Sequence, residues 1–66
     1  MFCEAQINEY NFRYEGEGDG VIEVSKVGDK NRTVLREIPV NGLDSEKKFH
    51  TEISFWFMAE GTTLLQ

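Results

Sequence analysis

The sequence predicts an all-β fold, a small four-stranded antiparallel meander. If the sheet curls strongly, the meander becomes a partly open barrel. Three observations lead to this prediction. Apolar and polar residues alternate over residues 1–14, β-branched residues are concentrated in residues 21–27 and 33–40, and turn-forming residues separate these segments. The strands are expected to be antiparallel because parallel neighbours need crossovers of about a dozen or more residues. The chain is predicted to form one β-rich domain, residues 1–66.

Residues 1–14 are predicted to form the first strand. Apolar residues alternate first at Met1, Cys3, Ala5 and Ile7, and then with the opposite parity at Tyr10, Phe12 and Tyr14. A bulge near Asn8–Glu9 explains the change of phase, since one extra residue turns the following side chains to the other face. Two short strands are the alternative, although Asn8–Glu9 lacks the glycine that tight hairpins favour.

The second strand is predicted at residues 21–27 (VIEVSKV) and the third at residues 33–40 (TVLREIPV). The segment between them, GDKNR at residues 28–32, has the composition of a turn. Pro39 has no backbone N–H to donate, so it belongs at the end of the third strand or on an edge of the sheet. Asn41–Gly42 predicts the next turn.

Residues 49–58 are predicted to form the fourth strand, because aromatic and β-branched residues dominate them. The alternative is an α+β fold, in which a three-stranded sheet packs on one helix at about residues 45–60. In that case Asp44 or Ser45 would cap the helix and Gly61 would end it. Its shared apolar face would consist of Phe49, Ile53, Trp56 and Phe57.

The net charge of −5 lies entirely in the first third of the chain. Residues 1–24 hold six acidic residues against Arg13 alone, whereas residues 25–66 hold six of each sign. A duplex-binding protein needs a basic face, so nucleic acid is a disfavoured partner. No segment resembles a signal peptide or a membrane span, so no contact with a membrane is expected. A single unpaired cysteine, Cys3, fits a reducing compartment, and we expect the protein to be cytoplasmic.

Acidic residues alternate with glycines in EGEGDG, residues 15–20. With the residues that follow, up to Lys26, this stretch resembles an EF-hand calcium loop with Gly20 at the invariant glycine. The resemblance implies a metal site with side-chain ligands from Glu15, Glu17, Asp19 and Glu23. However, Lys26 replaces the bidentate glutamate of the family, Glu15 stands where a shorter aspartate is usual, and strand-like segments replace the helices. We therefore expect a glycine-rich hairpin turn with weak cation binding at most, and no metal cofactor.

Catalytic residues are not expected. Cys3 lies on the apolar parity of the first segment, as a buried thiol would, and His50 lies between the polar residues Lys48 and Glu52. No Cys/His cluster has the spacing of zinc ligands. The sequence predicts neither an enzyme nor a bound cofactor.

The main functional prediction is a small acidic protein–protein interaction module, expected to inhibit or regulate a host protein and to form a homodimer. The aromatic residues exceed what one face of a four-stranded sheet can bury, and a two-fold dimer would cover the excess. The predicted interface consists of Phe49, Phe55, Trp56, Phe57 and Met58. A second predicted contact surface is electrostatic and consists of Lys26, Lys30, Arg32 and Arg36.

The alternative function is a single-stranded nucleic-acid-binding module. Aromatic side chains on a sheet can stack on bases while basic residues contact phosphates. The rings would be those of Tyr10, Phe12, Tyr14 or Trp56, and the phosphate contacts those of Lys26, Arg32 and Arg36.

Overall fold

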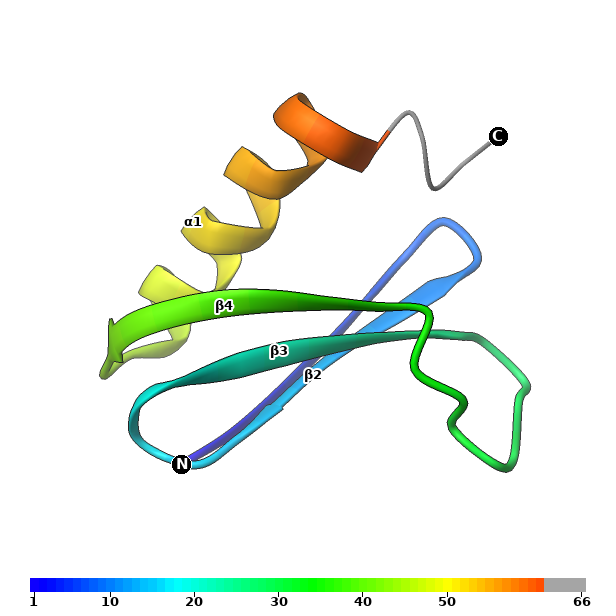
Figure 1. The fold of residues 1–66 in the computed structure, drawn as a ribbon, viewed down its shortest axis with the longest axis horizontal. Coiled ribbons are helices and arrows are strands. Elements are labelled where there is room, and N and C mark those ends of the chain that lie inside the picture. Colours follow the sequence, from blue (N-terminus) through cyan, green and yellow to red (C-terminus); the bar gives the residue numbers. More distant parts are fainter. Residues whose placement is uncertain (62–66) are drawn as a thin grey trace.

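The structure, a computed structural model, describes residues 1–61 and the side chains of residues 1–59. An antiparallel sheet in the order β1-β2-β3-β4 precedes a helix that packs on one of its faces (Figure 1). The strands are β1 (Phe2–Ile7), β2 (Tyr10–Glu15), β3 (Gly18–Lys26) and β4 (Arg36–Leu43). Helix α1 spans Glu46–Trp56 and continues as a π-helical segment, η1 (Phe57–Gly61).

The predicted four-stranded antiparallel sheet is present, but the helix makes the fold α+β, as in the alternative prediction. Two details differ from what the sequence suggests. The sheet keeps four strands where the alternative has three, and it is an open sheet with β1 and β4 as its edges rather than a barrel.

The first two strands correct the prediction of one bulged strand over residues 1–14. β1 and β2 are separate strands joined at Asn8–Glu9, with Ile7 and Tyr10 as the last paired residues. Asn8 adopts a φ of 56°. Asparagine tolerates this left-handed region better than most residues, so Asn8 takes the place of the glycine that the sequence lacks there.

The core lies between α1 and one face of the sheet. Alternate residues of β2, β3 and β4 are buried on this face together with Cys3 of β1, and α1 adds Phe49, Ile53 and Trp56. The Phe12 ring is fully buried at the centre, with its centroid 5.8 Å from that of Trp56 and 5.4 Å from that of Phe57. The buried strand residues are Cys3, Tyr10, Phe12, Tyr14, Ile22, Val24, Ile38, Val40 and Leu43.

The prediction of a strand at residues 49–58 is wrong, because these residues form most of α1 and the start of η1. Ser45 caps the helix, its side chain accepting a hydrogen bond of 3.1 Å from the Lys48 N–H. Phe49, Ile53 and Trp56 follow the helical period and lie on one face. Burying each side chain of this kind stabilises the fold by ~1.5–3 kcal/mol, which exceeds the ~1 kcal/mol spanned by strand preference.

β4 begins and ends later than the predicted third strand. Residues 33–35 belong to the long connection, residues 27–35, which we call the β3–β4 loop. Asn41–Gly42 lies inside β4 rather than forming a turn; Gly42 has a φ of 61°, and the register against β3 shifts between Gly18 and Gly20. Pro39 lies on a sheet edge, as predicted.

The glycine-rich segment forms the predicted hairpin turn between β2 and β3. Gly16 has a φ of 146° and Gly18 a φ of 79°, values that favour glycine. Gly20 serves a different purpose, since a Cβ atom there would lie 3.2 Å from the buried Tyr14 ring. The turn is therefore fixed by backbone conformation and by close packing.

Candidate functional site

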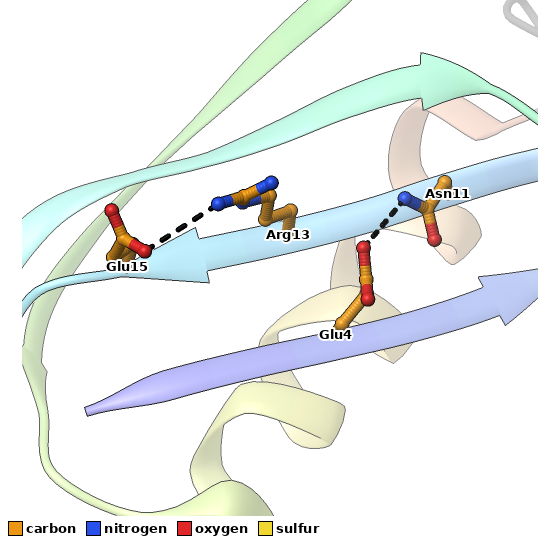
Figure 2. Close-up of polar contacts among 4 residues, drawn as sticks. All are labelled: Glu4, Asn11, Arg13 and Glu15. Atoms are coloured by element: carbon orange, nitrogen blue, oxygen red, sulfur yellow. Dashed lines mark hydrogen bonds and ion pairs between the residues drawn. The ribbon is translucent and has the colours of Figure 1, made fainter. Parts of the chain in front are cut away.

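The sheet face opposite α1, which we call the open face, carries polar side chains. Figure 2 shows Glu4, Asn11, Arg13 and Glu15 standing on this face of β1 and β2, with α1 behind the sheet. Side chains alternate between the faces of a strand, so the polar residues of one parity gather here as the apolar residues gather on the other face. The Asn11 Nδ2 donates a hydrogen bond of 2.9 Å to Glu4 Oε2, and this contact joins β1 to β2 across the open face.

Two hollows adjoin on the open face, with volumes of about 430 and 540 Å³. Both are lined by Asn11, Ser25 and Arg32, so they form one continuous depression, which we call the trough. Asn11 and Ser25 are cross-strand partners of β2 and β3, and Arg32 is contributed by the β3–β4 loop. The two strands therefore form the floor of the trough and the loop lines its side.

One end of the trough holds Glu15 and Glu23 beside Arg13. Arg13 lies there with its Nη2 atom 3.4 Å from Glu15 Oε2 and its guanidinium 5.0 Å from the centre of the Phe2 ring. Glu23 is the cross-strand partner of Arg13 on one side and of Glu37 on the other. Like charges directly opposite one another destabilise a sheet, so the Glu23–Glu37 pair favours the approach of a cationic group.

The other end of the trough carries a small excess of positive charge. Lys26, Lys30 and Arg32 line it together, beside the carboxylates of Glu4 and Asp29. Arg36, the fourth residue of the predicted electrostatic surface, does not line the trough; its Nη1 atom donates a hydrogen bond of 3.4 Å to the Leu35 carbonyl. The structure thus brings three of the four predicted basic residues to one place.

Asp29 holds the β3–β4 loop in shape. Its Oδ2 atom accepts a hydrogen bond of 2.9 Å from the Thr33 N–H, and its Oδ1 atom accepts one of 3.0 Å from the Asn31 N–H. These bonds, those from Thr33 first, hold the pKa of Asp29 below its usual value because they stabilise the carboxylate form. The loop that lines the trough is therefore ordered by a charged group.

The four carboxylates of the calcium-loop resemblance have separate environments. Glu15 pairs with Arg13, Asp19 accepts a hydrogen bond of 2.8 Å from the Gly42 N–H, and Glu17 and Glu23 are exposed. Within residues 1–61, no group of three or more His, Cys, Asp or Glu side chains could hold a metal ion.

The predicted aromatic interface is divided between the core and the surface. Phe49 and Trp56 are buried and Phe57 is half-buried against the core, whereas Phe55 is 66% exposed and Met58 is 85% exposed. Because the helix packs three of the five residues into or against the core, the aromatic residues no longer exceed what the fold can bury. An interface role remains a prediction for the two exposed residues.

The rings proposed to stack on nucleic-acid bases are also in the core. Tyr10, Phe12, Tyr14 and Trp56 are all buried. Stacking requires an accessible ring face, so these four rings are not available to bases.

Cys3 and His50 lie in different environments. Cys3 is a buried free thiol on β1. His50 is exposed on α1, where its Nε2 atom is 3.8 Å from Glu46 Oε1.

The trough itself was not predicted from the sequence, although part of its signal was present. Residues 11, 13, 15, 23 and 25 alternate with the buried residues of β2 and β3, so their common face follows from the strand period. The folding of the β3–β4 loop beside them depends on the side chain of Asp29 and has no periodic signal.

Across residues 1–61, every helix is too short or too polar to cross a membrane. No protein-family model matches the chain, and comparisons with curated proteins and with solved structures give no match.

Proposed function

We propose that this chain is a protein-binding module that holds an extended segment of a partner protein in the trough. The uneven distribution of charge along the trough is the observation that supports this function. Glu15 and Glu23 line one end beside Arg13, and Lys26 and Lys30 line the other beside Glu4 and Asp29. A bound segment with a basic residue at the first end and an acidic residue at the second would match both, and such complementarity fixes the orientation of a partner.

The lining of the trough favours a peptide over a small molecule. Small-molecule pockets are mostly apolar, with a few polar groups that orient the ligand. The trough is lined mainly by charged and amide side chains, with Val21, Val27 and Val34 as its larger apolar residues. Exposed charges of this kind contribute more to partner selection and association rate than to binding affinity.

The module acts by binding a segment of its partner in the trough, and this binding inhibits or regulates the partner protein. Its place is the cytoplasm, a reducing compartment in which the free thiol of Cys3 is stable. The partner is a protein rather than a nucleic acid, since the four rings that would stack on bases are buried and the net charge is −5.

A displayed library of random peptides tests this function, with the purified chain as bait. The selected peptides are expected to carry basic and acidic residues at a fixed spacing. Arg32→Glu should weaken their binding by about 5- to 30-fold, because Arg32 lines both hollows and its charge is reversed. Lys47→Glu makes the same change in charge at an exposed position of α1 and should leave binding unchanged.

Two results would contradict the proposed function. One is the absence of any enriched peptide. The other is a set of peptides whose binding is insensitive to Arg32→Glu but lost on changing Phe55 or Met58, which would move the contact surface to the helix.

A further inference from the structure

Within residues 1–61, β1 is an edge strand whose outer backbone groups have no neighbouring strand. The Gly16 N–H donates a hydrogen bond of 2.9 Å to the Met1 carbonyl, at the end of the β1–β2 ladder. Because successive residues of a strand direct their N–H and C=O groups to opposite sides, Phe2, Glu4 and Gln6 direct theirs away from β2. β1 contains no proline, glycine or lysine, the residues that usually protect an edge from pairing.

Among the side chains that the structure describes, the apolar core is also less well covered on the β1 side. Three apolar residues pack against the core while remaining half-buried: Ala5, Ile7 and Phe57. Ala5 and Phe57 both adjoin Phe12, because Ala5 is its cross-strand partner and the Phe57 ring centroid is 5.4 Å from that of Phe12; Ile7 follows Ala5 on the same face of β1. Open backbone groups and a less well covered apolar layer thus occur at the same edge.

We propose that a second copy of this chain pairs with β1, antiparallel and about a two-fold axis. The sheets of the two copies then join into one, with both helices on the same face. This inference goes beyond the proposed function and does not depend on the trough. It also differs from the dimer predicted from the sequence, which uses residues 49–58 as a strand.

The register of the pairing follows from the side chains of β1. Facing residues must lie on the same side of the sheet, so the axis passes at Glu4 or at Ala5. An axis at Glu4 brings two carboxylates face to face, which is unfavourable. An axis at Ala5 places Ala5 against its own copy, Cys3 against Ile7 on the core side, and Glu4 against Gln6 on the open face.

The Ala5 register gives favourable side-chain contacts on both faces of the joined sheet. On the core side, Cys3, Ala5 and Ile7 continue the apolar layer from one copy to the other. On the open face, a carboxylate meets an amide, and the outward backbone groups of Glu4 and Gln6 complete a hydrogen-bonded pair on each side of the axis. The same surface is used by both copies, as a two-fold interface requires.

Sedimentation velocity over protein concentrations up to the high micromolar range tests the proposal. The unmodified chain should form a dimer. Gln6→Glu should weaken it by about 2- to 30-fold, because it creates two pairs of facing carboxylates. The double change Glu4→Lys with Gln6→Glu should restore or strengthen the dimer at low salt. Asn41→Asp, the matched amide-to-acid change on the exposed face of β4, should have no effect.

Disulfide trapping tests the register separately. Ala5 faces its copy at a non-hydrogen-bonded pair, where Cα atoms lie about 4.5 Å apart, within the range of disulfide geometry. Ala5→Cys in a Cys3→Ala background should therefore form a covalent dimer on oxidation, and Asn41→Cys in the same background should not. A monomer at every concentration would overturn the proposal, and so would a dimer that neither Gln6→Glu weakens nor Ala5→Cys traps.

Discussion

The two sides of the core are covered to different extents. On the β4 side, Ile38, Val40 and Leu43 are at most 5% exposed. On the β1 side Cys3 is buried, but Ala5 and Ile7 remain half-buried. Apolar residues face the core in both strands, so the presence of apolar residues alone does not account for the contrast.

The connection of the helix accounts for it. Only Asp44 and Ser45 separate β4 from α1, so the helix begins beside β4, as Figure 1 shows. Its 11 residues span about 16 Å at a rise of about 1.5 Å per residue, and its last turn reaches Phe12 on β2. α1 therefore reaches β2 with its last turn, and η1 places Phe57 beside Phe12, while Ala5 and Ile7 on β1 stay half-buried. The position of a short helix in the chain decides which edge of a small sheet is left open.

Truncating one apolar residue on each side should produce the largest effect and measure this difference directly. Leu43→Ala is expected to lower the free energy of unfolding by about 2–5 kcal/mol, because Leu43 is fully buried and its loss leaves a cavity. Ile7→Ala removes a half-buried side chain and should cost about 1–2 kcal/mol.

Urea unfolding at several protein concentrations gives both values. If β1 pairs with a second copy, the loss of unfolding free energy caused by Ile7→Ala should grow with protein concentration. The loss caused by Leu43→Ala, compared with the unmodified protein at the same concentration, should stay constant. Equal costs for the two substitutions at low concentration would show that both sides of the core are equally well covered.

The bulge in β4 should have the next largest effect. Gly42 has a φ of 61°, and a side chain in that conformation costs about 1–2 kcal/mol. A Cβ atom at Gly42 would meet the Lys48 Nζ at 3.5 Å, an ordinary contact, so backbone strain alone sets the loss. Gly42→Ala should lower the free energy of unfolding by this amount, while Asn41→Ala next to it should change it by less than about 0.5 kcal/mol. An unchanged urea midpoint for Gly42→Ala would mean that β4 can relax into a regular edge.

The sheet was largely predictable because its signal is periodic. Alternation in residues 1–14 and the β-branched residues 21–27 predict strands that the structure contains. The point at which β1 ends was missed because Asn8 replaces glycine in the turn, and composition alone does not distinguish that turn from a bulge. The late start of β4 was missed because Asp29 extends the loop through side-chain hydrogen bonds.

The helix was missed for a different reason. Phe49, Ile53 and Trp56 fit a helical face, but Phe55 and Phe57 also fit a strand together with Phe49 and Ile53. Only the presence of a sheet that needs covering favours the helix, and this is a property of the whole fold. The same holds for the candidate site. The strand residues of the trough share a parity that the sequence shows, but the charged loop residues join them only when the β3–β4 loop folds beside the strands.

The smallest expected effect is the pH response of the β3–β4 loop. Hydrogen bonds from Thr33 and Asn31 hold the pKa of Asp29 below 3.8, so the carboxylate contributes stability that is complete above pH 3.8. This contribution is lost as the pH falls from 3.8 through the lower pKa of the folded state. The protection of the Asn31 and Thr33 amides against exchange, corrected for the pH dependence of intrinsic exchange and followed by NMR, should therefore fall in this range. Asp29→Asn removes the titrating group, and subtracting its profile isolates the response of Asp29 from that of other carboxylates. A loss of protection of the same size in both proteins would show that the loop is held by contacts other than those of Asp29.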